Sequence, residues 1–251
     1  MLKIGTRMNY MASISDFFKS PKWMMNLLLG GVCCLIPVVG PLVLMGWLIT
    51  GFWAREDQRC ETFPDFDFNL FGKYLERGVW PFLVMLVVSL VLGLAMSFLI
   101  VPITLVPGML MAGSDGHASG AAGAVMALFM MVIYVVMVLV MIFVLKPLLI
   151  RASIVQDFAP SFDFGFVKKF AATMWIEILL SSLFIMIASG LLMCLGMLAF
   201  CVGIYLAMVL VYFCWFHLDK QLYALYLERG GEPVPLSPKL QDVPPPSMPV
   251  G

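Results

Sequence analysis

Two segments of this chain, residues 55–68 and 151–164, repeat one pattern at a distance of 96 residues. In each copy an arginine is followed nine residues later by a proline and then by Phe-Asp-Phe. Lys73 and Lys169 keep the same offset. Because both copies lie between long apolar runs, the pattern indicates that a membrane-embedded unit has been duplicated.

The composition places the chain in lipid. Hydrophobic residues make up 62% and charged residues only 12%, with a mean hydropathy of +1.01, whereas soluble domains carry about 25% charged residues. We predict an all-α integral membrane protein, a helical bundle of five to six apolar segments with internal repeats and amphipathic interfacial helices. The six segments are Trp23–Ile36, Pro41–Trp53, Val79–Met111, Ala121–Ile150, Trp175–Met193 and Leu198–Phe216.

Three regions follow from this pattern. Residues 1–22 are expected to form a cytoplasmic or interfacial N-terminal segment, and residues 23–229 a membrane domain. Residues 230–251 are rich in proline and have little to bury, so they predict a disordered tail. The repeated units within the membrane domain are about 23–55, 64–151 and 160–229.

The first apolar run, interrupted by Pro37 and Pro41, allows two topologies. The Lys and Arg residues fall in or next to four basic segments: the N-terminus, residues 55–77, residues 146–169 and the C-terminal tail. A hairpin places all four on the cytoplasmic side, as the positive-inside rule favours, and both chain ends with them. A single span leaves the basic N-terminus outside. The hairpin has a difficulty, because 14 helical residues cover only about 21 Å of a core of about 30 Å. Its turn is tolerable only where other helices bury it.

The repeated Phe-Asp-Phe segments resemble starts of helices. An aspartate can accept hydrogen bonds from the amides that follow it, so Asp67 and Asp163 are predicted helix caps. Aromatic residues around them favour an amphipathic helix at the membrane surface. The predicted interfacial residues are Phe66, Phe68, Phe162 and Phe164.

Basic residues follow the apolar segments that are predicted to return to the cytoplasmic side, and two more lie in the second repeated loop. Cations there complement the helix dipole and set topology, and they could instead bind the phosphates of anionic lipids. The candidates for headgroup binding are Arg55, Arg151, Arg229, Lys168 and Lys169.

Small residues recur at four-residue spacing, which lets helices approach closely in lipid. The predicted packing positions are Gly116, Gly120, Ala199, Gly203 and Ala207. The spacing leaves open whether the partner helix belongs to this chain or to another.

Catalytic chemistry finds little support in the residues. Within the apolar segments Glu177 is the main ionisable candidate, and Lys146 is placed where its side chain can snorkel to the interface. Asp115 and His117 give a weak metal signal in one loop, and the cysteines form no C-x-x-C pair. We therefore expect no metal, no cofactor and no catalytic residue. With a net charge of zero, nucleic acid is not an expected partner.

Several short motifs are similar to those of one known family. They are the segment Phe17–Trp23, the pair Gly30-Gly31, the spacing from Arg55 to Pro64, and the segment Phe63–Phe66. They resemble the prokaryotic polytopic membrane proteins catalogued as domain of unknown function 4013, over roughly residues 10–230. The resemblance implies a multi-pass protein of the cytoplasmic (inner) membrane of a bacterium or archaeon, and it implies no activity.

Two functions remain open. The first is a non-enzymatic membrane scaffold or accessory subunit that contacts lipid headgroups and packs against another membrane protein or itself. The alternative is a small transporter or channel for a lipid or apolar solute, since duplicated units and interrupted helices are common in transporters. An intramembrane enzyme comes third.

Overall fold

The computed structural model describes residues 8–55, 57, 59–111, 119–199 and 202–241, and this part of the chain is helical without strands. The predicted all-α membrane fold is confirmed. Four helices are long and apolar enough to cross a membrane, and two shorter apolar helices precede them. The long helices are α4 (Phe71–Met111), α5 (Ser119–Val155), α6 (Phe164–Leu198) and α7 (Val202–Glu228), and the short ones are α2 (Trp23–Cys34) and α3 (Val39–Phe52).

Short helical turns connect these elements at their polar ends. The turns are α1 (Ala12–Ser15), η1 (Asp16–Lys19), η2 (Cys60–Thr62), η3 (Phe68–Leu70), η4 (Ala159–Ser161) and α8 (Pro238–Gln241). The long helices extend beyond the apolar segments seen in the sequence, and α7 continues to Glu228 rather than stopping near Phe216. Hydropathy marks the apolar part of a helix, whereas the hydrogen-bonded backbone continues into its polar end.

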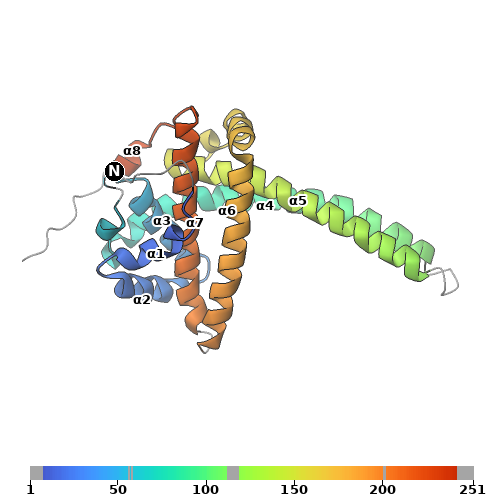
Figure 1. Ribbon diagram of the computed structural model, residues 1–251, viewed down its shortest axis with the longest axis horizontal. Helices are drawn as coiled ribbons and strands as arrows, with labels where there is room; N and C mark the ends of the chain where they lie inside the picture. The colour runs from blue at the N-terminus through green and yellow to red at the C-terminus, as the bar shows by residue number, and fades with distance from the viewer. Residues whose placement is uncertain (1–7, 56, 58, 112–118, 200–201, 242–251) are drawn as a thin grey trace, which may run out of the picture.

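The helices form a bundle with a projecting arm (Figure 1). Helices α6 and α7 lie side by side, and α2 and α3 pack against α7. Helices α4 and α5 pair with each other and leave the bundle sideways, across the direction of α6 and α7. We call the part of α4 and α5 that projects from the bundle the arm.

Helix α3 is the centre of the bundle. Its residues from Leu42 to Phe52 are all buried. Gly46 and Gly78 let α3 and α4 cross with their backbones in contact, since a Cβ at Gly46 would lie 1.7 Å from the Tyr74 carbonyl oxygen. Trp47 donates from Nε1 to the Pro64 carbonyl over 2.9 Å, which fixes the repeated loop onto this helix.

Two short helices replace the uncertain first span. Helices α2 and α3 pack together on either side of a turn at residues 35–38, as the hairpin interpretation requires. The turn itself is not buried by other helices, because Leu35, Ile36 and Val38 are 46–58% exposed. The structure satisfies its amides differently: Leu35 and Ile36 donate back to the end of α2, and Val39 donates to Pro37.

The expected disorder of the tail is wrong for residues 230–241. Leu240 is completely buried and Val234 nearly so. The backbone is also held, since Ser237 donates to the Ile154 carbonyl over 3.0 Å and Val234 donates to the Tyr223 hydroxyl over 2.7 Å. A few apolar residues and two backbone bonds therefore order a segment whose composition suggested none. Residues 242–251 lie outside the described part.

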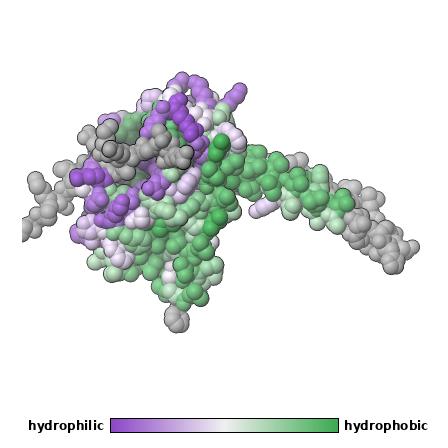
Figure 2. Space-filling model, viewed as in Figure 1, coloured by the Kyte–Doolittle hydropathy of each residue, from purple (hydrophilic) through white to green (hydrophobic). Residues whose placement is uncertain are grey.

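The four basic segments of the sequence meet at one end of the molecule. Ion pairs join Lys22 to Asp65 and Lys169 to Glu232, linking the N-terminal segment, the repeated loops and the tail. Figure 2 shows hydrophilic residues gathered at the upper left over these loops, while hydrophobic residues cover the described parts of the arm and of α6 and α7. We call the hydrophilic region the polar end.

Candidate functional site

The repeated arginines close the loops that follow them. Arg151 donates from Nε to the Pro160 carbonyl over 2.8 Å, which accounts for the nine-residue spacing of that copy. Its guanidinium also pairs with Asp163 over 3.0 Å. In the first copy Arg55 donates to the Thr62 hydroxyl over 2.6 Å. Both predicted headgroup ligands are thus engaged within the protein, where they hold a loop shut.

The third arginine does not repeat this contact. Arg229 directly follows α7 and reaches across to α6, where it pairs with Glu177 and donates to the Thr173 carbonyl over 3.0 Å. That carbonyl lies beside a break in α6, where Met174 has non-helical angles of φ −120° and ψ 20°. Glu177, the strongest candidate for an intramembrane site, is therefore half of an ion pair that joins α6 to α7.

Both repeated aspartates occupy N-caps. Asp67 accepts from the Asn69 amide over 2.8 Å at the start of η3, and Asp163 accepts from the Phe166 amide over 3.0 Å at the start of α6. The capping oxygen satisfies an amide that the helix leaves without a partner. Each cap needs only contacts between residues two or three positions apart, so the repeated local sequence produces it in both copies.

The aromatic residues beside the caps divide into two groups. Phe68 and Phe164 are exposed, by 44% and 66%. Phe162 is partly buried and packs against Phe158. Phe66 belongs to the core: it is 3% exposed and its ring meets Trp47. The expected interfacial role of Phe66 is therefore corrected, since its ring packs on Trp47 of α3 and its backbone amide donates to Asn26 Oδ1 over 2.9 Å.

The small residues at the α6–α7 turn pack within the chain. Gly203 meets Gly196, and a Cβ on Gly203 would lie 2.6 Å from the Gly196 carbonyl oxygen and 2.8 Å from the Cβ of Ala199. Ala207 is buried. Gly196 completes this contact and was missed by the four-residue spacing. Gly116, like Asp115 and His117, lies outside the described residues, and Gly120 belongs to α5 without a described environment.

A buried ion pair, not foreseen from the sequence, joins α5 to α7. Lys146 Nζ lies 2.6 Å from Asp219 Oδ1, and each side chain is only 7% exposed. Lys146 does not snorkel to the surface as expected. Asp219 lies just beyond the apolar run that ends at Phe216, so hydropathy alone gave no reason to place it beside Lys146. The signal that could have found it is the opposite charge of two residues at the polar ends of neighbouring helices.

A second buried cluster connects the N-terminal segment to α7. The Asp16 carboxylate lies 3.3 Å from His217 Nε2 and 3.5 Å from Cys60 Sγ, and all three residues are buried. Burial opposes the charge of Asp16, but hydrogen bonds from His217 and Lys19 outweigh it and lower the pKa of Asp16 to about 2. Burial and the neighbouring carboxylate raise the pKa of the Cys60 thiol to about 12.

The spacing of these three groups is compatible with a metal ion, but the surroundings of the histidine oppose one. Gln221 accepts from the Asn9 amide and donates to the Asn9 carbonyl, which orients its own amide group. Its nitrogen then lies 2.9 Å from His217 Nδ1, so that atom acts as acceptor and the ring proton sits on Nε2, facing Asp16. A metal bound at Nε2 would move the ring proton to Nδ1. There the proton would face the Gln221 amide nitrogen, which is itself a donor. The cluster is better described as a hydrogen-bond network.

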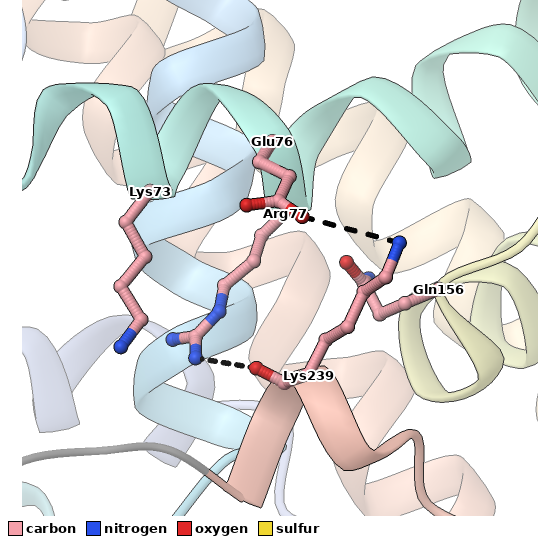
Figure 3. Close-up of a pocket in the computed structure, with 5 residues that line it drawn as sticks. All are labelled: Lys73, Glu76, Arg77, Gln156 and Lys239. Atoms are coloured by element: carbon pink, nitrogen blue, oxygen red, sulfur yellow. Dashed lines mark hydrogen bonds and ion pairs between the residues drawn. The ribbon is translucent and has the colours of Figure 1, made fainter.

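Two cavities lie at the polar end, one for each copy of the repeated lysine. The first, of about 140 Å³, is lined by Lys73, Glu76, Arg77, Gln156 and Lys239 (Figure 3). The second, of about 190 Å³, is lined by Arg151, Asp163, Gly165, Phe166, Lys169, Tyr226, Glu232, Pro233 and Val234. Both cavities use the ordered tail as one wall. We call them the basic cavity and the neutral cavity, because three cations and one carboxylate line the first, while two of each line the second.

Comparison with known proteins gives a family but no activity. A family model described as "Protein of unknown function (DUF4013)" matches residues 29–202, which is 174 of the 251 residues. No curated protein and no solved structure matches the chain.

Proposed function

The chain belongs to the DUF4013 family of proteins of unknown function, and we propose that it is a non-enzymatic scaffold or accessory subunit of a membrane protein complex. In this proposal the arm packs against another membrane protein, and the polar end contacts lipid headgroups. We also propose that the chain resides in a prokaryotic cytoplasmic membrane with both ends on the cytoplasmic side.

The exposure of α5 carries the proposal. The most apolar membrane-length stretch of this helix has no buried residue, although α5 pairs with α4. In α4 the corresponding stretch is 17% buried, against 50% in α7. The described part of the arm therefore presents apolar surface on nearly every side, and what covers it has to come from outside the described chain. Lipid covers such a surface, and a second membrane protein does so with more specificity.

The outer part of α4 has the surface that close helix packing needs. Ser89, Gly93 and Ser97 follow one another at four-residue spacing, and no atom lies within 4 Å of where a Cβ on Gly93 would be. Small residues at this spacing let a second helix approach closely in lipid. The spacing thus supports a partner helix along this face of the arm.

Lys168 supports headgroup contact better than the other four predicted cations. It is exposed and forms no ion pair within the part of the chain that the structure describes. Lys169, by contrast, pairs with Glu232 over 2.8 Å, and the three arginines hold loops or α6. Headgroup binding therefore concentrates on fewer residues than the sequence suggests.

The test is copurification from native membranes in a mild detergent, followed by native mass spectrometry. We expect a stoichiometric protein partner with the wild type and its loss with Gly93→Leu. The matched control is Gly190→Leu on α6, because Gly190 is also exposed and also has no atom within 4 Å of its Cβ position. A wild-type protein recovered only as a monomer with lipid would refute the scaffold proposal.

One observation favours a transporter as the second candidate. Lys146 and Asp219 form a buried pair between two helices that are long and apolar enough to cross a membrane, and buried ionisable residues in such helices commonly serve ion or proton pathways. Flux measured in liposomes would test this function. Transport that is abolished when both residues are replaced by leucine, in a protein that remains folded, would favour the transporter over the scaffold.

A further inference from the structure

We propose that the neutral cavity binds a phosphodiester that carries a primary amine, with its phosphate at Lys169 and Tyr226 and its ammonium group at Glu232. Phosphatidylethanolamine carries this chemistry in its headgroup, and glycerophosphoethanolamine carries it in solution. As a headgroup site, the cavity rests on the lipid contact proposed above for the polar end, and it names the kind of lipid and the atoms that receive it.

Tyr226 contributes a hydroxyl that forms no hydrogen bond within the part of the chain that the structure describes. The residue is only 2% exposed, and its ring is held 4.7 Å from that of Phe170 and 5.7 Å from that of Phe166. Tyr223 on the same helix differs, because its hydroxyl accepts from the Val234 amide over 2.7 Å. Buried phenols usually find a hydrogen-bond partner. A Tyr226 hydroxyl in the wall of a cavity therefore points to a ligand that accepts from it.

The tail fixes this wall of the cavity on both sides of Glu232. Gly231 lies on the Tyr226 ring, since a Cβ at Gly231 would be 2.4 Å from Cζ, the atom that bears the hydroxyl. The Gly231 amide also donates to the Tyr226 carbonyl over 2.9 Å, and Val234 is held by Tyr223. The backbone of Glu232 is thus placed beside the hydroxyl, while its side chain is 75% exposed and can turn.

The four charges of the lining divide into a fixed pair and an exchangeable pair. Arg151 donates to the Pro160 carbonyl and pairs with Asp163, so its guanidinium is held within the loop. The pair of Lys169 and Glu232 is 60% and 75% exposed, and water screens the attraction of such a pair. A ligand can replace this contact by offering an acceptor to Lys169 and a donor to Glu232.

The charge balance of the cavity selects a zwitterion. Two cations and two carboxylates line it, so an added ion of one sign would leave a charge without compensation. A phosphodiester accepts from Lys169 and Tyr226, and a primary ammonium group donates to Glu232. A trimethylammonium group has no N–H to donate, which disfavours choline. A volume of about 190 Å³ is many times the roughly 10–15 Å³ that holds one water, so both charged groups have room.

Residues suited to the membrane surface flank the lining in sequence. Phe164, between two lining residues, is 66% exposed. Lys168, directly before Lys169, is also exposed. Aromatic side chains and lysines that extend toward water are typical of the headgroup region of a bilayer. These neighbours favour a lipid over a soluble phosphodiester as the source of the ligand.

The experiment compares the wild type with Tyr226→Phe, Glu232→Gln and the control Glu76→Gln. Tyr226→Phe removes a hydroxyl that bonds to no described residue, so it should keep the wild-type Tm. Glu76 is the matched control, because it is a carboxylate of the polar end that is 61% exposed and pairs with Lys239 outside the neutral cavity.

Two measurements separate the sources of the ligand. Native mass spectrometry measures retention of phosphatidylethanolamine against phosphatidylcholine and phosphatidic acid with the same acyl chains. Thermal unfolding in detergent measures stabilisation by glycerophosphoethanolamine, with glycine as a zwitterion that lacks the phosphate. Selective retention of phosphatidylethanolamine identifies a headgroup, and stabilisation by glycerophosphoethanolamine without lipid selectivity identifies a soluble phosphodiester.

We expect the wild type to retain one phosphatidylethanolamine with about tenfold preference over the other two lipids. Tyr226→Phe should lower this affinity about fivefold, and Glu232→Gln about tenfold or more because it removes a charged partner. Glu76→Gln should change it by less than about twofold. Absence of both effects in the wild type, equal stabilisation by glycine, unchanged affinity in Tyr226→Phe or Glu232→Gln, or an equal loss in Glu76→Gln overturns the proposal.

The wider proposal is read from different signals in the same samples. Partner copurification should not change in any of these variants, so the scaffold role fails or stands on its own. General lipid contact is read from total retained lipid, which Lys168→Gln should lower without changing the preference for the ethanolamine headgroup. A lost preference with total lipid unchanged would refute the cavity as the site and leave the lipid contact of the polar end in place.

Discussion

The buried pair of Lys146 and Asp219 should respond to mutation in a way that separates a structural role from a transport role. Asp219→Asn leaves a lysine ammonium 93% buried without its carboxylate. Breaking such a pair from one side costs about 3–5 kcal/mol, because the remaining charge loses its partner and cannot reach water. For a chain of this size, each kcal/mol corresponds to about 2–4 °C in Tm. The expected loss is therefore about 6–20 °C.

The exposed pair of Lys169 and Glu232 is the matched control. Its Nζ–Oε1 distance of 2.8 Å is close to the 2.6 Å of the buried pair, but its side chains are 60% and 75% exposed. Glu232→Gln should then cost at most about 1 kcal/mol, since water screens the charges. The difference between the two variants measures the effect of burial at nearly constant geometry.

The assay is thermal unfolding in detergent. The protein carries a fluorescent C-terminal fusion, and the fluorescence that stays in solution after heating and centrifugation measures the folded fraction. The double variant Lys146→Met/Asp219→Leu should recover most of the lost stability, because removing both charges together leaves no buried ion. A Tm for Asp219→Asn within about 2 °C of the wild type would refute the burial argument. A stable double variant that no longer supports transport would show that the pair serves transport rather than stability.

Three further outcomes follow from the polar end. The Cys60 thiol, whose pKa is raised to about 12, should react with maleimide at pH 8 on the order of 10³-fold more slowly than an exposed cysteine. The reaction should be faster in Asp16→Asn, and equal rates in this variant and the wild type would place Cys60 outside the cluster. The ionised Asp16, with its pKa lowered to about 2, stabilises the fold above about pH 4, and this contribution is lost as the pH falls toward 2; Tm measured over this range should fall less in Asp16→Asn than in wild type. Arg151→Gln should cost about 1–3 kcal/mol in thermal unfolding while Lys168→Gln stays within about 0.5 kcal/mol, and similar losses would mean that Arg151 does not clamp its loop.

Local features of this fold could be predicted from the sequence. The helices follow from long apolar runs, and the caps at Asp67 and Asp163 follow from contacts only two or three residues away. The repeat predicted that Arg55 and Arg151 play the same part, although it did not predict that this part is to close a loop. A repeated spacing records a repeated geometry, but it does not say which atoms meet.

Features that depend on distant contacts could not be predicted in this way. Lys146 and Asp219 are 73 residues apart, and Arg77 reaches a tail residue 162 positions later. The tail itself illustrates the reason: most of its residues favour disorder, and Leu240 orders it only because a pocket in the bundle receives that side chain. Composition averages over the segment, whereas burial of one leucine depends on the shape of its surroundings.

The arrangement of the two long helix pairs links this fold to its proposed role. Each of the four helices can cross a membrane by its length and composition, yet in Figure 1 the arm runs across the direction of α6 and α7. One membrane normal cannot follow both pairs in this arrangement. Pro81 lies in α4 and Pro147 in α5, and each proline removes a helical hydrogen bond and weakens its helix against bending. Within the described chain, α4 packs on α3 and α5 packs on α6, and these contacts hold the start of the arm. In the proposed scaffold role, a docked partner then sets the direction of the part of the arm that projects beyond these contacts.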